Sequence, residues 1–330
     1  MKNYNIAIVG ATGLVGTTFL KIIEEYDIKF NNLKLFASER SKGKKVSFKG
    51  KDYLLHVLEK DCFKDIDFVL FSAGGAISKQ YALQAVAEGA IVIDNSSAFR
   101  MDKNVPLVVP EVNISDAYNK QLIANPNCST IQCVVPLKTL DVNYSIESVE
   151  YNTYQAVSGA GVKGINDYNH QDESGPKYFP YDIRETCIPH IDSFVEDGYT
   201  KEEHKMIDET KKILHNDEIL VSATCIRVPV LNSHGVTIKI VLKKEFTIED
   251  IRELLRNTES VILLDEPGKN IYPTSTYANG NDKIYVGRIR RDKVNEKAVL
   301  LYVVADNIRK GAATNTVQIM KGIMDYENII

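Results

Sequence analysis

The sequence predicts an α/β protein with two domains, an N-terminal parallel sheet wound with helices and an α+β domain with a broader sheet. Over the first third of the chain, short apolar runs alternate with helical patterns, which is typical of βαβ units. A glycine-rich turn follows the first apolar run. After Asn125 the expected strands are longer and partly alternate between apolar and polar residues, which favours a mixed or antiparallel sheet.

The N-terminal domain begins with an apolar, β-branched run at residues 4–10 that predicts a buried strand. Apolar residues at helical spacing then predict a helix over residues 13–25. A second strand is expected at residues 33–37. Two further strands and the helix between them are expected at residues 67–71, 91–94 and 77–87.

The second domain begins with a helix expected over residues 129–140. Thr200 and Glu203 have the spacing of a capping box and predict a helix that runs to about residue 215. A last helix is expected over residues 311–324. Four longer strands are expected at residues 146–156, 221–227, 236–243 and 298–306. The change of pattern places the domain boundary near Asn127.

The composition is that of a globular protein, with 44% hydrophobic and 25% charged residues among 330. The formal net charge is −4, from 40 basic and 44 acidic residues, so we expect no nucleic acid as the main partner. No apolar window approaches the roughly 20 residues of a membrane span, and the first apolar run is too short for a secretory signal. Five scattered cysteines favour a reducing, cytoplasmic compartment.

The glycine turn predicts a dinucleotide site, because glycines let the backbone approach a pyrophosphate at a helix N-terminus. Its spacing is Gly-x-x-Gly-x-x-Gly rather than the commoner Gly-x-Gly-x-x-Gly, so a plain strand-to-helix turn is the alternative. The expected cofactor residues of this turn are Gly10, Thr12, Gly13, Leu14 and Val15.

The end of the second strand decides between NAD and NADP, since a carboxylate there suits a ribose hydroxyl and an arginine suits a 2′-phosphate. Arg40, flanked by Ser38 and Ser41, favours NADP. Glu39 would favour NAD if it faced the ribose, and a solvated turn is the third interpretation. Small residues after a later strand, Ser72 and Gly74, leave room for the cofactor.

Cys128 is the candidate nucleophile. It stands just before the expected helix over residues 129–140, and the partial positive charge of a helix N-terminus favours a thiolate. A single cysteine is more often a small buried hydrophobe. That interpretation fits the other four cysteines better than Cys128, whose neighbours Asn127, Ser129 and Thr130 are polar.

Several segments resemble the aspartate-β-semialdehyde dehydrogenase family, in the right order and over nearly the whole chain. Asn-Cys-Ser-Thr resembles its nucleophile motif, and Tyr-Gln-Ala-Val-Ser-Gly-Ala-Gly its next signature. Arg-Val-Pro-Val-Leu-Asn-Ser-His resembles the segment with a substrate arginine and the catalytic histidine. These segments and three more lie at residues 127–130, 154–161, 227–234, 96–100, 286–290 and 306–311.

The resemblance implies that residues 1–127 with 307–330 form a Rossmann-like NADP-binding domain. Residues 128–306 would form a catalytic and dimerisation domain similar to that of glyceraldehyde-3-phosphate dehydrogenase, usually in a homodimer. The implied reaction joins L-aspartate 4-semialdehyde, phosphate and NADP to give L-aspartyl 4-phosphate and NADPH through a Cys128 thioester. Biosynthesis runs it in reverse, towards diaminopimelate, lysine, threonine and methionine.

The resemblance also implies a role for each matching residue. His234 would be the acid and base, a role that suits histidine near neutral pH, and Gln155 would also be catalytic. Backbone passage near the nicotinamide is expected at Ser158 and Gly159, with Asn307 a further cofactor residue. The implied substrate residues are Arg227 for the carboxylate, Arg100 and Lys205 for phosphate, Glu202, and Asn127.

Some alternatives stay open. Glu202 and Lys205 could be a solvated surface pair one helical turn apart. The enzyme N-acetyl-glutamyl-phosphate reductase shares the fold and chemistry, although it typically has glycine before the cysteine and tyrosine after it. A catalytically silent NADP-binding regulator is a rival of another class. No His-x-His or His-Glu-x-x-His spacing occurs, so no metal site is expected.

Overall fold

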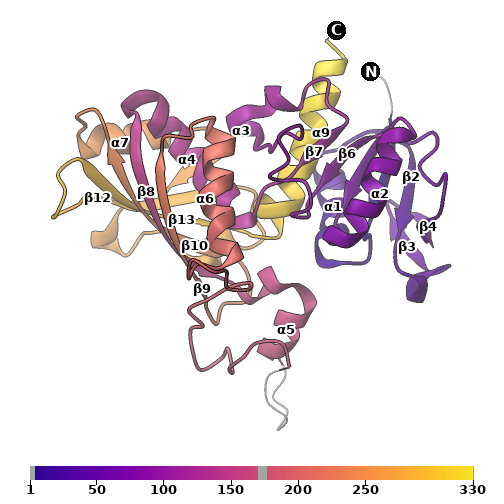
Figure 1. Cartoon of the computed structure of the whole chain (residues 1–330), viewed down its shortest axis with the longest axis horizontal. Helices are drawn as coiled ribbons and strands as arrows, with labels where there is room; N and C mark the ends of the chain where they lie inside the picture. Colours follow the sequence, from indigo (N-terminus) through magenta and orange to yellow (C-terminus); the bar gives the residue numbers. More distant parts are fainter. Residues whose placement is uncertain (1–3, 170–176, 330) are drawn as a thin grey trace. The chain divides into compact units, whose positions relative to one another are not determined.

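The computed structural model describes residues 4–169 and 177–329. The chain divides into two compact units. One holds the chain as far as Pro126 and from Ala312 onward, and the other is Asn127–Gly311. Each unit has a sheet of its own (Figure 1). No helix in the described part of the chain combines the length and apolar character needed to cross a bilayer.

The first unit contains a seven-stranded sheet in the order β3-β4-β2-β1-β5-β6-β7. Its strands are β1 Tyr4–Val9, β2 Phe30–Phe36, β3 Lys45–Phe48, β4 Lys51–His56, β5 Phe68–Phe71, β6 Ile91–Asp94 and β7 Leu122–Ala124. All pairs are parallel except β3 with β4. The predicted parallel sheet is confirmed, whereas the β3–β4 hairpin and β7 were not predicted.

Helices pack on the parallel sheet because its strands are apolar on both sides. They are α1 Leu14–Glu25, α2 Gly75–Ala87, α3 Pro110–Asn113, α9 Thr314–Glu327 and the short turns η1 Glu39–Ser41 and η2 Ile114–Ala117. The last helix, α9, contacts α1 and β6 (Figure 1). Its Val317 and Met320 join Phe19 and Ile22 of α1 in one buried cluster, so the C-terminal end of the chain completes the N-terminal core.

The second unit contains a six-stranded mixed sheet in the order β11-β12-β13-β10-β8-β9. Its strands are β8 Ile146–Gln155, β9 Leu220–Arg227, β10 His234–Leu242, β11 Val261–Leu263, β12 Ile284–Arg291 and β13 Ala298–Ala305. Strand β10 is antiparallel to both β8 and β13, while β8 and β9 are parallel. The four strands expected here and the mixed character of the sheet are confirmed; β11 and β12 were not predicted.

The helices of this unit are α4 Cys128–Tyr144, α5 Gly161–Asn169, α6 Lys201–Leu214, α7 Ile248–Arg256 and α8 Ser275–Ala278, with short turns η3 Val157–Ala160, η4 Pro267–Lys269 and η5 Arg309–Ala313. The capping box that opens α6 is confirmed, since Thr200 accepts from the amide of Glu203 and returns its own amide to the Glu203 carboxylate. The last helix begins later than expected, because a π-helical turn occupies Arg309–Ala313.

The contacts place Asn127 and residues 307–311 in the second unit, whereas the sequence-based division assigns them to the first domain. The physical reason lies in their hydrogen bonds. The main-chain and side-chain amides of Asn127 both bind α6, and Asn307 binds Ser158 and the amide of Ser233.

Candidate active site

In the first unit, the turn after β1 has the conformation that its glycines permit. Gly10 has φ 85°, and a Cβ there would lie 2.7 Å from the carbonyl oxygen of Ser72, so the position requires glycine. A Cβ at Gly16 would overlap the carbonyl oxygen of Gly10. Gly13 is the N-cap of α1. The chain therefore enters α1 tightly and with little side-chain bulk, as at a pyrophosphate site.

The predicted cofactor residues of this unit gather at one edge of the sheet. β1 pairs in parallel with β2 and with β5, so the turns that follow these three strands share an edge. The strand order reverses there, between β1 and β5, which is where open α/β sheets bind ligands. The residues concerned are Gly10, Thr12, Gly13, Leu14, Val15, Ser38, Arg40, Ser41, Ser72 and Gly74.

The charged residues near this edge bear on anion binding. Arg40 is exposed on η1, and the carboxylate of Glu39 beside it lies 4.0 Å from the ammonium of Lys42. Glu39 therefore has a cation near it. Arg100, the predicted phosphate ligand, follows β6, is 9% exposed and donates from Nη2 to the carbonyl of Asn95 at 2.8 Å.

In the second unit, Cys128 is the first residue of α4 and is half-buried. The N-cap is Asn127, whose side-chain oxygen accepts from the amides of Ser129 at 2.9 Å and Thr130 at 3.4 Å. A Cβ at Gly311 would lie 2.9 Å from the Cβ of Cys128. The cysteine thus stands where the helix favours a thiolate, against a segment that leaves no room for a side chain.

Glu202 connects the predicted substrate residues and is 6% exposed. It accepts from Asn127 Nδ2 at 2.8 Å, from Gln155 Nε2 at 3.2 Å and from Lys205 Nζ at 3.1 Å. A solvated surface pair is therefore the wrong description of Glu202. Burial raises the pKa of Glu202, but Lys205, Asn127 and Arg227 lower it by more, so its pKa lies below the ordinary value and the group is ionised at neutral pH.

His234, the first residue of β10, is fully buried. The amide of Ala156 donates to its Nδ1 at 2.9 Å, so the neutral ring carries its proton on Nε2, an assignment that follows from the hydrogen bond. Nε2 has no hydrogen-bond partner among the described residues. Burial, and then the nearby Arg227, hold the pKa of His234 well below its ordinary value, so the ring is neutral at physiological pH.

Arg227 ends β9 and is 5% exposed. Its Nη1 donates to the carbonyl of Ala156 at 2.7 Å. Burial lowers the pKa of Arg227, while Glu202 and Cys128 act in the opposite direction. The effect of Cys128 on the Arg227 pKa is consistent with a guanidinium that favours the Cys128 thiolate. A methyl group at Gly159 would lie 2.8 Å from Arg227 Nη1 and 3.0 Å from His234 Cε1, so this glycine packs directly on both side chains.

Ser158 and Asn307 lie together, as the Nδ2 of Asn307 donates to Ser158 Oγ at 3.0 Å. Asn307 also accepts from the amide of Ser233 at 2.8 Å. Ser233 has φ 74°, which is strained for a non-glycine residue, and it directly precedes His234. The strained turn therefore helps to fix the position of His234 at the start of β10.

Sequence reasoning missed contacts that depend on the main chain. The amide of Ala156 donates to His234, and its carbonyl accepts from Arg227. No sequence pattern predicts these contacts. Glu209, which binds the amide of Asn127, and Gln132, which donates to the carbonyl of His234 at 3.1 Å, were also missed. Gln132 sits on a helix whose other buried positions are largely apolar, and Glu209 lies between the buried Met206 and Ile213, so a polar residue among buried apolar ones is the available signal.

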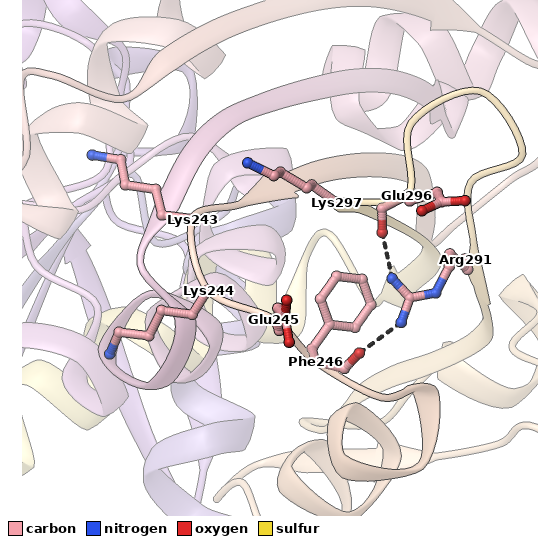
Figure 2. A pocket seen from close by; sticks show the side chains of 7 residues that line it. All are labelled: Lys243, Lys244, Glu245, Phe246, Arg291, Glu296 and Lys297. Carbon is pink, nitrogen blue, oxygen red and sulfur yellow. Dashed lines mark hydrogen bonds between the residues drawn. The ribbon is translucent and has the colours of Figure 1, made fainter.

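A pocket of about 350 Å³ lies elsewhere in this unit and holds none of these residues (Figure 2). Its lining is mostly charged and comprises Lys243, Lys244, Glu245, Phe246, Arg291, Glu296 and Lys297. The guanidinium of Arg291 donates to the main-chain carbonyls of Glu296 and Phe246 and lies 4.2 Å from the Phe246 ring centroid. Arg291 is therefore already bound to main-chain groups, and none of the site residues predicted from the sequence lines this pocket.

This arrangement suits covalent catalysis on an anionic carbonyl compound. A cysteine at a helix start provides the nucleophile. A neutral histidine offers an N–H donor, and a buried arginine offers a planar fork for a carboxylate. Glu202 holds Asn127, Gln155 and Lys205 around this centre.

Comparisons with known proteins agree with this chemistry. Residues 5–120 match the family "Semialdehyde dehydrogenase, NAD binding domain", and residues 137–310 match "Semialdehyde dehydrogenase, dimerisation domain". The chain is 53% identical to aspartate-semialdehyde dehydrogenase of Aquifex aeolicus, with 96% of each chain covered. The Bacillus subtilis relative is 43% identical, with 98% of each chain covered.

Solved structures give the same result. Aspartate semialdehyde dehydrogenase II from Vibrio cholerae, in a complex with ASA, is 41% identical with a TM-score of 0.94, covering 98% of this chain and 99% of that one. The enzyme from Candida albicans, solved with NADP, is 26% identical with a TM-score of 0.78, covering 99% of this chain and all of that one.

Proposed function

This chain belongs to the aspartate-semialdehyde dehydrogenase family, and from that premise we propose that it interconverts L-aspartate 4-semialdehyde and L-aspartyl 4-phosphate with NADP and phosphate. The observation that carries the proposal is the grouping of Cys128, Arg227, His234 and Glu202 in one unit. The reductive direction is the biosynthetic one, towards diaminopimelate, lysine, threonine and methionine.

The residues of the first unit fit a nicotinamide dinucleotide. Gly10 and Gly16 form a backbone cradle that a Cβ would fill, and Gly13 caps the helix at which a pyrophosphate would bind. Arg40 is exposed at the adjacent turn, while Glu39 has Lys42 within ion-pair distance. These facts support NADP rather than NAD, because a guanidinium suits a 2′-phosphate. Bound NADP supplies the hydride acceptor.

Cys128 is the proposed nucleophile. The N-terminus of α4 and the cationic Arg227 both favour the thiolate, which forms by releasing its proton to solvent before the substrate arrives. The thiolate adds to the aldehyde carbon, giving a thiohemiacetal whose oxygen carries the negative charge. After oxidation the sulfur holds a thioester, and phosphate attacks that carbonyl and releases the thiolate.

His234 acts in this proposal as a hydrogen-bond donor. Its Nε2–H is the group available to the charged oxygen, because Nδ1 accepts from Ala156. A role as the base for Cys128 would require a proton on Nδ1 and the loss of that hydrogen bond. Donation without proton transfer stabilises the developing oxyanion, as a main-chain amide does in an oxyanion hole.

Different cationic residues are proposed to bind the substrate carboxylate and phosphate. Arg227 is proposed to hold the α-carboxylate, since its fork matches a carboxylate, and Glu202 to hold the ammonium group of the substrate. Lys205 bridges Glu202 and Asp192 and is proposed as a phosphate residue, and Arg100 is proposed separately for the same role. The match of residues 137–310 to a dimerisation domain supports a homodimer.

A cytoplasmic location is also part of the proposal. All five cysteines, each of which lies in the described part of the chain, are free thiols. Free thiols persist in a reducing compartment, which supports this location.

The decisive test is NADP reduction by the purified protein with L-aspartate 4-semialdehyde and phosphate. We expect turnover that needs both substrates, a larger kcat/KM with NADP than with NAD, and loss of turnover in Cys128→Ser with NADP binding retained. N-acetyl-glutamate 5-semialdehyde serves as the comparison substrate. Greater activity with it, or more than about a hundredth of the wild-type rate in Cys128→Ser, would contradict the proposal.

A further inference from the structure

We propose that Glu209 is a positioning residue for the nucleophile: its carboxylate holds the main-chain amide of Asn127 and so fixes the start of α4, where Cys128 stands. The inference rests on the proposed role of Cys128. It assigns a function to a second carboxylate of α6, besides the substrate residue Glu202.

The geometry of Asn127 carries the proposal. Its main-chain amide donates to Glu209 Oε2 at 2.6 Å, and its side-chain amide donates to Glu202 Oε1 at 2.8 Å. Its side-chain oxygen caps α4 through the amides of Ser129 and Thr130. Asn127, the residue before the nucleophile, is thus hydrogen-bonded to α6 and caps α4.

Glu202 and Glu209 can act together because they are seven residues apart on α6. Residues at i and i+7 share one face of a helix and lie roughly 10 Å apart along its axis. Two carboxylates on one rigid element therefore approach Asn127 from two points, which fixes its orientation as well as its position.

Glu209 is 1% exposed, and a buried carboxylate is costly unless it is hydrogen-bonded. The start of α4 offers compensation, since partial positive charge gathers at a helix N-terminus. The observed hydrogen bond, at 2.6 Å, is short for an N–H···O bond. A negative charge on Glu209 would oppose thiolate formation at Cys128, the residue after Asn127, so electrostatic activation of the thiol does not explain Glu209. Placement of the backbone does.

Placement matters because a displacement of about 1 Å at a reacting centre can reduce turnover by roughly a hundredfold. Cys128 follows Asn127 directly, so any shift of the Asn127 amide moves the nucleophile relative to the carbonyl it attacks. The charged groups of the semialdehyde are assigned to Arg227 and Glu202, so we expect the larger effect in kcat rather than in KM.

The test compares Glu209→Met, Glu209→Gln and a control, Glu203→Met. Glutamine keeps an acceptor without charge, while methionine keeps the volume without an acceptor. We expect Glu209→Met to lower kcat about tenfold or more with KM for the semialdehyde within about threefold. Hydrogen exchange at the Asn127 amide should accelerate in this variant, and Glu209→Gln should stay near the wild type in both measurements.

Glu203 is the matched control because it is also a buried carboxylate of α6, bound to the amides of Thr200 and Cys225. Glu203→Met should lower the melting temperature comparably and leave kcat within about threefold. Equal kcat in the two methionine variants, or a loss in Glu209→Gln as large as in Glu209→Met, would overturn the inference.

A variant that does not fold and a wild type that is inactive each need a separate interpretation. If Glu209→Met does not fold, Glu209→Asp replaces it, since aspartate keeps the charge but draws the acceptor back, and it should lose kcat where glutamine does not. If the wild type fails to oxidise the semialdehyde, the proposed function is wrong. The exchange measurement still tests the proposed hold of Glu209 on the Asn127 amide, because an unchanged exchange rate at that amide in Glu209→Met would refute it.

Discussion

Gly159→Ala should damage the active site although it replaces no catalytic side chain. The added methyl group would lie 2.8 Å from Arg227 Nη1, 3.0 Å from His234 Cε1 and 3.1 Å from His234 Nε2. Gly159 lies in the short turn η3, and its φ is not left-handed. Alanine is therefore acceptable to the backbone, and the whole effect is steric.

The magnitude follows from these distances. Carbon and nitrogen atoms that are not bonded pack at about 3.5 Å, so the methyl group overlaps both side chains by roughly half an ångström or more. Neither neighbour can move freely, because Arg227 is held by the Ala156 carbonyl and His234 by the Ala156 amide. Overpacking of this kind costs about 1–3 kcal/mol. Expressed at the reacting centre, that is a loss of roughly 5- to 150-fold in kcat/KM.

Steady-state kinetics with the semialdehyde, phosphate and NADP provide the measurement. The control is Gly268→Ala on η4, where a Cβ would meet nothing within 4 Å and φ is not left-handed. We expect wild-type kinetics in the control. Gly159→Ala with kcat/KM within twofold of the wild type would show that small shifts of Arg227 and His234 do not matter, and the reasoning from close packing would fail.

Two further changes test the same centre. Arg227→Lys keeps the charge but loses the fork, so we expect a cost of about 1.5–3 kcal/mol in kcat/KM for the semialdehyde with little change in the KM for phosphate; the reverse pattern would exchange the roles of Arg227 and Arg100. The pKa of His234 is lower in the folded than in the unfolded protein. Below about pH 6.5 the unfolded chain therefore binds a proton that the folded protein does not, and the free energy of unfolding falls by up to about 1.4 kcal/mol per pH unit. Urea unfolding at pH 7.5 and 5.5 should therefore show a smaller decrease in His234→Asn than in the wild type, and equal decreases would mean that the ring is protonated in the folded protein.

The strands of the first unit were predictable for a physical reason. Parallel strands buried on both faces are continuous apolar runs, and β1, β5 and β6 have this form. The β3–β4 hairpin does not, since its strands mix polar with apolar residues and are largely exposed. Its turn is Lys49-Gly50, both with positive φ, and lysine is an unusual residue there.

The helix α7 illustrates a signal that was present but weaker. Thr247 and Asp250 form a capping box in the structure, yet the usual pattern has glutamate or glutamine at the fourth position. The predicted box of α6 carries that glutamate, at position 203. A cap with the commoner residue was therefore sufficient to place a helix from the sequence, and the shorter aspartate was not.

Within the site, motifs identify side chains and tertiary packing supplies their partners. Cys128, Arg227 and His234 lie in recognisable segments. The Ala156 groups that orient two of them are main-chain atoms, and every residue has those. Only the approach of the segment after β8 to Arg227 and His234 makes the Ala156 groups functional, so a sequence pattern had nothing to distinguish them.

Glu209 lies between these cases, and its helix shows how such a residue can be found. Met206 and Ile213 mark the buried face of α6. At 3.6 residues per turn, position 202 is one turn before Met206, and position 209 falls between the two apolar residues on the same face. A carboxylate beside these buried apolar residues is costly unless it is hydrogen-bonded. Amphipathic spacing alone therefore predicts that Glu209 binds something inside the protein, while the identity of that partner, the amide before the nucleophile, requires the three-dimensional structure.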